Sequence, residues 1–355
     1  MTFPKTSRWA GQFLAPALLL LAAGCGDGTP QGNNGTGENK LTETLKGEIT
    51  IDGSSTVAPI SSEAKEEFNK EYKNVNIKLS ITGTGDGFKR FSADETDVSN
   101  ASRPIKASEM KLCQETGVEF IEIPVAYDGL TIVVNTENDW VDQITVEQLK
   151  TIFSADTAPK TWKDVDASWP EEELKIYAPG TESGTFDYFN EVVLEDAKMR
   201  SDFSPSADDN TLVNGVKGNK SAIGFFGASY YFNNEDSLKA LAVVNPETKE
   251  AVTPTAETIE SGEYAPFSRP LFIYVKKSSM DRAEVKIFVN YYLDHAAEMA
   301  KEVFYVPLPS TVYEAAKKHV KELKVGTHYL TESGEKRKGS VIQVYKADNL
   351  VTELD

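Results

Sequence analysis

Residues 174–186 read Leu-Lys-Ile-Tyr-Ala-Pro-Gly-Thr-Glu-Ser-Gly-Thr-Phe. The first four residues are typical of a strand, glycine and hydroxyl residues follow, and apolar residues then recur at helical spacing from Phe186 to Val193. The same order of strand, Gly/Ser/Thr run and helix occurs twice earlier, in residues 48–72 and 76–91. Alternating strands and helices predict an α/β fold with largely parallel sheets, in which ligands bind at the carboxyl ends of strands.

Three runs rich in glycine and hydroxyl residues lie at these strand-to-helix junctions, and we name them the first, second and third loops. A helix N-terminus presents unpaired backbone N–H groups and the positive end of the helix dipole, while glycines permit close approach and hydroxyls add hydrogen bonds. Three such loops predict one buried oxyanion. They are Gly53-Ser54-Ser55-Thr56, Gly83-Thr84-Gly85-Asp86-Gly87 and Gly180-Thr181-Glu182-Ser183-Gly184-Thr185.

The rest of the chain continues the alternation of strands and helices. Thr145 and Gln148 form a capping box that predicts a helix as far as Phe153. In the polar C-terminal segment, residues 340–345 are a predicted strand. Predicted core residues at helical spacing are Phe88, Phe91, Phe186 and Phe189. Further strands are predicted at 98–101, 120–124, 130–134, 222–226, 241–244 and 271–275, and helices at 281–304 and 311–323.

The N-terminus has the pattern of a secretory signal. Two basic residues precede an apolar run, residues 13–23, which is shorter than the roughly 20 residues that span a bilayer. The run ends in Leu21-Ala22-Ala23-Gly24-Cys25, which resembles a bacterial lipobox. We therefore expect residues 1–25 to be a lipoprotein signal peptide and Cys25 to carry lipid, with plain secretion as the alternative. Residues 26–46 are a predicted flexible tether, and Cys113 then has no disulfide partner.

The composition is acidic, with 37 Lys and Arg against 55 Asp and Glu and a formal net charge of −18 at pH 7. This balance disfavours nucleic acid and anionic membrane surfaces as partners. Long-range attraction by the net charge does not recruit an anion either, so capture is expected to depend on short-range hydrogen bonds in a dry, preorganised pocket. The three histidines, His295, His319 and His328, lack metal-ligand spacing, and no metal or cofactor is expected.

Five strings resemble the phosphate-binding proteins of bacterial phosphate ABC transporters, in the branch with a Ser-Arg-Pro-Ile motif. In chain order they are Asp52-Gly53-Ser54-Ser55-Thr56-Val57-Ala58-Pro59, Ser99-Asn100-Ala101-Ser102-Arg103-Pro104-Ile105, Gly180-Thr181-Glu182-Ser183-Gly184-Thr185-Phe186, Ala222-Ile223-Gly224-Phe225 and Ser268-Arg269-Pro270-Leu271-Phe272. The resemblance implies a type II periplasmic-binding-protein fold, in which two α/β lobes joined by a hinge close over one phosphate. Lobe I would comprise residues 47–124 plus 266–323, lobe II residues 125–265, and residues 324–355 a C-terminal extension of unknown role.

The resemblance also implies the ligand-binding residues. They belong to the three loops and to the Ser-Arg-Pro-Ile string, and each offers a hydroxyl, a backbone N–H or a guanidinium. In chain order they are Ser55, Thr56, Thr84, Arg103, Ser183, Gly184 and Thr185.

Two positions depart from the pattern of many family members. Arg103 stands where many have aspartate, and Pro179 where many have arginine, so we expect a guanidinium to bind phosphate from the opposite wall. By the logic of the family, the replaced aspartate accepts the proton of hydrogen phosphate and so rejects sulfate. We expect hydroxyl lone pairs or Glu182 to take over this role, and we expect the Asp86 side chain to point away from the anion.

The expected function is high-affinity binding of inorganic phosphate outside the cytoplasm and delivery to the permease subunits of an ABC transporter. The protein is expected to be a monomer, anchored by its lipid to the bacterial membrane in the periplasm or at the cell surface. The alternatives are a binding protein for another oxyanion (sulfate, molybdate or arsenate) and a surface phosphate sensor. Phosphoester hydrolysis is disfavoured, because Ser183 lacks the spacing of a nucleophile elbow and no histidine has a recognisable partner for base catalysis.

Overall fold

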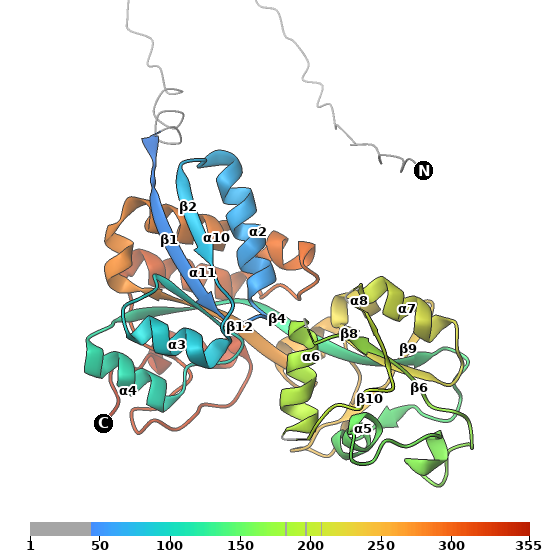
Figure 1. Ribbon diagram of the computed structural model, residues 1–355. Helices are drawn as coiled ribbons and strands as arrows, with labels where there is room; N and C mark the ends of the chain where they lie inside the picture. Colours follow the sequence, from blue (N-terminus) through green and yellow to red (C-terminus); the bar gives the residue numbers. More distant parts are fainter. Residues whose placement is uncertain (1–43, 182, 196, 207) are drawn as a thin grey trace, which may run out of the picture. The chain divides into compact units, whose positions relative to one another are not determined.

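The fold is shown in Figure 1 as a computed structural model, which describes residues 44–181, 183–195, 197–206 and 208–355. The signal segment with Cys25, the tether as far as residue 43, and Glu182 lie outside the described residues. In the part that the structure describes, no helix has the length and apolar character needed to cross a membrane.

The first three strands form a parallel set, and a helix follows each of them. Strand β1 (Gly47–Gly53) pairs in parallel with β2 (Val75–Leu79) and β3 (Val98–Ala101). The helices that follow are α2 (Ala58–Glu71), α3 (Thr84–Ser92) and α4 (Ala107–Thr116). The predicted order of strand, loop and helix is confirmed here. However, α3 already begins at Thr84, so most of the second loop is helical.

Strand β4 (Phe120–Asn135) is 16 residues long, and all of them are buried. Its first half pairs antiparallel with β12 (Ser268–Lys276), and its second half pairs antiparallel with β8 (Ala222–Gly227) and β9 (Leu238–Ala240). Both segments predicted as strands, 120–124 and 130–134, are therefore confirmed as strand, but they are parts of one continuous strand.

Gly129 lies in the middle of this strand, and close packing explains why the position is a glycine. A Cβ at this position would lie 2.8 Å from Cδ1 of Ile259 and 3.1 Å from Cβ of Ala228. Both distances are shorter than ordinary carbon contacts. The strand therefore continues through Gly129 and joins the sheet of the first half of the fold to that of the second.

The second half of the fold repeats the parallel pattern around β6 (Lys175–Pro179), which pairs with β8 and β7 (Ser204–Ser206). The full strand order is β2-β1-β3-β12-β4-β8-β6-β7, with β9 beside β4, and a smaller sheet has the order β11-β10-β5. The α/β class is confirmed, but parallel and antiparallel pairs are mixed instead of largely parallel. The remaining strands are β5 (Gln143–Ile144), β10 (Ala242–Val244) and β11 (Ala251–Val252), and the helices are α5 (Val146–Phe153), α6 (Gly184–Phe189), α7 (Asp209–Lys217), α8 (Ala228–Phe232) and α9 (Ala256–Ser261).

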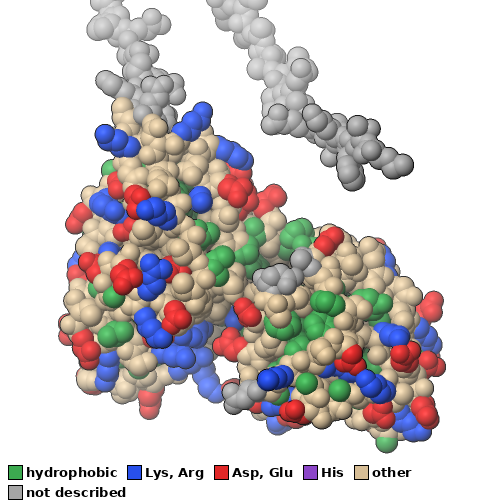
Figure 2. Space-filling model, in the orientation of Figure 1, with side chains coloured by type: hydrophobic (Ala, Val, Ile, Leu, Met, Phe, Trp, Pro, Cys, Tyr) green, Lys and Arg blue, Asp and Glu red, His purple; other side chains and the backbone are tan. Residues whose placement is uncertain are grey.

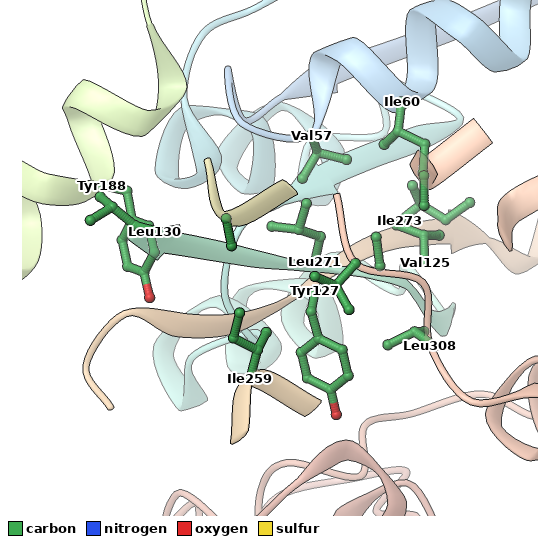
Figure 3. Packing of buried hydrophobic residues seen from close by; sticks show 14 of the residues in the cluster. Val57, Ile60, Val125, Tyr127, Leu130, Tyr188, Ile259, Leu271, Ile273 and Leu308 are labelled. Atoms are coloured by element: carbon green, nitrogen blue, oxygen red, sulfur yellow. The ribbon is translucent and has the colours of Figure 1, made fainter. Parts of the chain in front are cut away.

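The largest hydrophobic core surrounds the strands that both halves share. Figure 3 shows Val125, Tyr127 and Leu130 of β4 together with Leu271 and Ile273 of β12 inside this cluster. Helices α10 (Ala283–Glu302) and α11 (Ser310–Glu322), which confirm the two long helices predicted, pack on this region. The phenylalanines predicted to be core residues are all buried. The division into lobes I and II stays a prediction.

The C-terminal extension completes a second core. Its buried side chains Tyr329, Leu330, Val344 and Val351 pack in one cluster with residues of α3, α4 and β12, including Phe88 and Phe272. Cys113 is buried in the same cluster, and burial raises the pKa of its thiol to about 12, which keeps it protonated at neutral pH.

The predicted strand at 340–345 is wrong, because this segment forms the short helix α12 (Val341–Val344). Ser340 and Gln343 make a capping box at its start, and the Ser340 N–H donates to Oε1 of Gln343 at 3.1 Å. Local capping thus outweighs the strand preference of the apolar residues.

Candidate anion-binding site

The first loop follows β1 and is built on a glycine that no other residue replaces without strain. Gly53 has a φ of 134°, and a Cβ there would lie 2.2 Å from the carbonyl oxygen of Asn100. The backbone N–H of Ser54 donates to the same oxygen at 3.0 Å. The N–H of Thr56 donates to Oγ of Ser54 at 3.2 Å. The N–H of Thr56 is therefore bonded within the loop, whereas its hydroxyl makes contacts outside it.

The second loop lies directly against the first. A Cβ on Gly87 would lie 2.6 Å from Cα of Gly53, so two glycines are needed where α3 meets the end of β1. Thr84, at the N-terminus of α3, accepts a hydrogen bond from the N–H of Ser102 at 3.2 Å, and the two hydroxyl oxygens are 3.1 Å apart. Ser102 was not among the predicted site residues, although it belongs to the Ser-Arg-Pro-Ile string.

A cavity of about 250 Å³ opens where these loops meet helix α6 and strand β12. Four of the predicted residues line it, namely Ser55, Thr56, Thr84 and Arg103. Sequence reasoning missed six further side chains that line it, which are Ser54, Ser102, Asp187, Tyr188, Glu191 and Arg269. The cavity thus combines hydroxyls, two guanidiniums and two carboxylates.

Arg103 lines the cavity but already has a carboxylate partner. Its Nη1 and Nη2 atoms donate to the two carboxylate oxygens of Glu109 at 2.9 and 2.7 Å. Glu109 is fixed in turn by the N–H of Lys106 at 2.8 Å, at the start of α4. This bidentate pair holds the guanidinium in one orientation. The ring of Phe88 lies 5.7 Å from Cζ of Arg103, so this core residue also supports it.

Arg269 in β12 is the second guanidinium at the cavity. Its Nη2 donates to Oγ1 of Thr56 at 3.0 Å, and its Nε donates to Oδ2 of Asp128 at 3.2 Å. The guanidinium carbon lies 3.5 Å from the ring centroid of Tyr188, a close cation–π contact. Nη1 also pairs with Glu191 at 3.3 Å. The signal for Arg269 was present in the Ser-Arg-Pro string that contributed to the resemblance, but its partners lie far away in the sequence.

Asp128 is almost completely buried, with 1% of its side chain exposed. Burial raises the pKa of this carboxyl, and the neighbouring Arg269 opposes that rise by its charge and its hydrogen bond. The pair therefore fixes Arg269 at the end of β12, next to the first loop.

The third loop lies at an adjoining cavity. Ser183, Gly184 and Thr185 form the N-terminus of α6 and line a space of about 520 Å³ that also contains Ser55 and Tyr305. Ser183 caps the helix, because its Oγ accepts the N–H of Thr185 at 3.2 Å.

Contact between the first and third loops is nevertheless close. The hydroxyl of Thr56 lies 3.5 Å from the carbonyl oxygen of Gly184, and a Cβ on Gly184 would lie 2.8 Å from Cα of Thr56. The structure therefore brings four of the seven predicted residues to one cavity and places the other three beside it.

Two carboxylates at the cavity are placed to accept hydrogen bonds. Asp187, in the first turn of α6, accepts the hydroxyl of Ser55 at 3.1 Å, and Glu191 lies one turn further on. Glu182, the acceptor proposed from the sequence, lies outside the described residues. Asp86 behaves as expected: its side chain is 60% exposed, pairs with Lys89 at 2.7 Å and does not line the cavity.

Comparisons with known proteins agree with this architecture. A model of the PBP superfamily domain matches residues 36–296. "Protein SphX" of Synechococcus elongatus is 47% identical over 306 residues, which cover 85% of this chain and 89% of that protein. "Phosphate-binding protein PstS" of Staphylococcus epidermidis is 40% identical over 303 residues, covering 85% and 89%. The crystal structure of a possible phosphate binding protein from Planctomyces limnophilus has a TM-score of 0.76 at 40% identity, and the match covers 79% of this chain and 99% of that one.

Proposed function

The chain belongs to the PBP superfamily and, within it, to the bacterial phosphate-binding proteins, and we propose that it binds inorganic phosphate and delivers it to the permease of an ABC transporter. The observation that carries the proposal is the 250 Å³ cavity, where hydroxyls at two helix N-termini meet two fixed guanidiniums. Such an arrangement suits a tetrahedral oxyanion, because each of its oxygens accepts hydrogen bonds from more than one direction.

The ligand-binding residues that we propose act in two groups. Ser55, Thr56 and Thr84 offer hydroxyls, while Arg103 and Arg269 offer charged N–H groups held in place by Glu109 and Asp128. Each hydrogen bond to a charged group contributes about 1.5–3 kcal/mol. A handful of these bonds is enough for micromolar binding, which corresponds to about 8 kcal/mol, after the cost of ordering the site.

The third loop completes the site in this proposal. Ser183, Gly184 and Thr185 lie at the adjoining cavity, and Ser55 lines both cavities. The third loop already touches the first at Thr56, so a small adjustment of this contact would let its hydroxyls and the N–H of Gly184 reach the anion. Closure of lobe II on lobe I supplies such an adjustment, and the ligand favours it because only the closed state makes all the hydrogen bonds at once.

Discrimination against sulfate is proposed to come from Asp187. A carboxylate accepts the proton of hydrogen phosphate but repels a fully ionised anion. Asp187 is the carboxylate that already bonds to Ser55 at the cavity, so it takes the role that the sequence suggested for Glu182.

The proposed function is binding and transport without catalysis. Ser183 caps its own helix, and none of the three histidines lines the cavity: His319 of α11 and His328 of the C-terminal extension are buried, and His295 lies on α10. We further propose that the mature protein is a monomer, that Cys25 carries lipid, and that the lipid anchors it at the outer side of the bacterial membrane.

The decisive experiment is calorimetric titration of the purified mature protein with phosphate, sulfate, arsenate and molybdate at several pH values. We expect saturable one-to-one binding of phosphate and no competition by sulfate in equal concentration. No heat with phosphate would refute the proposal. Equal competition by sulfate would favour a general oxyanion-binding protein and would remove the proposed role of Asp187.

A further inference from the structure

A second cavity, of about 420 Å³, adjoins the cavity proposed for phosphate. The two share five lining residues, Arg103 and Arg269 among them. The other side of the second cavity is formed by a loop of the C-terminal extension that carries Lys336, Arg337 and Lys338. We name these three consecutive residues the basic loop.

The side chains that line this cavity carry a net positive charge, which is opposite in sign to the net charge of the whole molecule. Five cationic side chains line it against the two carboxylates of Glu191 and Glu247. The chain as a whole carries −18, and acidic and basic side chains are interspersed over most of the face seen in Figure 2. The extension therefore concentrates positive charge beside the proposed phosphate site.

The basic loop has a defined conformation. Leu330 and Lys336 form an antiparallel bridge, and the N–H of Thr331 donates to the carbonyl oxygen of Glu335 at 2.9 Å. Arg337 is bound twice: its N–H donates to the carbonyl of Tyr329 at 2.7 Å, and its Nε donates to that of Leu330 at 3.1 Å.

The segments before and after the basic loop are both attached to strand β4. The buried carboxylate of Glu122 accepts the hydroxyl of Thr327 at 2.6 Å and the N–H of His328 at 2.9 Å. After the loop, the Tyr345 hydroxyl donates to the carbonyl oxygen of Glu122 at 2.8 Å, and the N–H of Val341 donates to the hydroxyl of Tyr127 at 3.3 Å. The cations are thus held beside the cavity by the fold itself.

We propose that the basic loop is an entry site for the anion, in which Lys336 and Lys338 attract phosphate from solution and accelerate its passage into the binding cavity. The inference rests on the proposed function. It also revises the expectation from the sequence that long-range attraction plays no part, because that expectation considered net charge alone. The local field at the mouth of a site governs association, whatever the sign of the total charge.

The exposure of these lysines indicates that they act on the association of phosphate and not on the retention of bound phosphate. The Lys338 side chain is 77% exposed, and its Nζ lies 2.7 Å from Oε1 of Glu247, which is itself 68% exposed. Charges at the rim of a site change the association rate and its salt dependence, whereas buried contacts change the dissociation rate.

The test compares phosphate association and dissociation rates, measured by stopped-flow protein fluorescence, in the wild type and the double variant Lys336→Gln/Lys338→Gln. At about 10 mM salt, where the Debye length is about 30 Å, we expect the association rate constant to fall about three- to tenfold. At about 1 M salt, where the Debye length is about 3 Å, we expect the two proteins to agree. The dissociation rate should not change. Arg337 is left intact because it holds the loop.

Two further variants sharpen the test. Glu247→Gln removes the negative partner of Lys338 and should raise the association rate at low salt. Lys160→Gln is the matched control, because Lys160 is 74% exposed, pairs with Asp202 at 2.8 Å and does not line the cavity; we expect no change in rate.

The proposal is overturned if the double variant associates as fast as the wild type at low salt, or if its loss appears in the dissociation rate and persists at 1 M salt. Failure of the proposed function is a separate result, since the wild type itself would then give no phosphate signal in the calorimeter.

Discussion

Replacing Arg269 by glutamine tests both the stability and the binding role of the second guanidinium. The variant leaves Asp128, which is 1% exposed, without its cationic partner. Removing one member of a buried ion pair costs about 3–5 kcal/mol. We expect a value near 3 kcal/mol, because the Arg269 side chain keeps 12% exposure and glutamine can still donate a hydrogen bond.

The loss of stability should depend on pH in a defined direction. Burial raises the pKa of Asp128 in the folded protein, and Arg269 opposes the rise, so the variant raises this pKa further. A carboxyl whose folded pKa exceeds its unfolded value of about 4 favours folding at low pH. That contribution is lost as the pH rises through the folded pKa. The deficit of Arg269→Gln relative to the wild type should therefore be larger at pH 7.5 than at pH 5.

Urea unfolding at the two pH values measures this deficit, and a second substitution separates its causes. Asp128→Asn in the Arg269→Gln background removes the unpaired charge and should restore most of the stability. Phosphate affinity, measured by calorimetry, should stay about thirty-fold to several-thousand-fold below the wild type, by analogy with truncated charge pairs of about 2–5 kcal/mol.

The matched control is Arg200→Gln. Arg200 is also buried, binds Asp202 through Nε and Nη2 and donates to the carbonyls of Ile152 and Pro159, but does not line the cavity. It should lose stability and keep its phosphate affinity. The reasoning is refuted if Asp128→Asn restores no stability to the Arg269 variant, or if the stabilised double variant binds phosphate like the wild type.

Three further substitutions address the other parts of the proposal. Arg103→Ala should weaken phosphate binding by about 2–5 kcal/mol, since it leaves the carboxylate of Glu109 without its partner beside the anion; a change below threefold in calorimetry would remove Arg103 from the site. Gly184→Ala should lower the free energy of unfolding by about 1–3 kcal/mol, because its Cβ would meet the backbone of Thr56 at 2.8 Å, and it should also weaken phosphate binding; unchanged affinity in calorimetry would mean that this contact plays no part in the site. Cys25→Ser should bind phosphate normally but leave the membrane fraction of cells, and retention there would exclude the lipid anchor.

Local patterns predicted much of the fold, because the signals lie within a few residues of each other. The capping box of Thr145 and Gln148 and the spacing of apolar residues placed α5, α10 and α11 nearly correctly. The errors arose where contacts between residues far apart in the sequence determine the local structure. Residues 120–124 and 130–134 read as two strands, but they belong to one strand, in which Gly129 packs closely against Ile259 and Ala228, residues remote from it in the sequence.

The candidate site could be predicted where the local composition of the loops, rich in glycine and hydroxyl residues, marks them in the sequence. Hydroxyl and glycine residues at helix N-termini pointed to the loops, and the resemblance singled out Ser55, Thr56 and Thr84 within them. Arg269 stood in the Ser-Arg-Pro string, but its place at the site was not recognised, because it depends on Asp128, which is 141 positions away in the sequence and adjacent only through the pairing of β12 with β4. The basic loop was hidden for the same reason: its place beside the cavity depends on Glu122 and a core that only the folded chain assembles.

The pairing of both guanidiniums with carboxylates bears on selectivity. Arg103 and Arg269 are oriented before the ligand arrives, so less side-chain freedom is lost on binding. Their partners Glu109, Asp128 and Glu191, however, reduce the positive charge that the cavity offers to a dianion. In the proposed site, binding then relies on directed hydrogen bonds, and we expect an anion with a proton to donate to gain a bond to Asp187 where sulfate meets only repulsion. The partners of the two guanidiniums thus weaken attraction for every oxyanion, whereas Asp187 is expected to favour hydrogen phosphate among them, and the proposed basic loop would supply the rapid capture that the cavity itself does not.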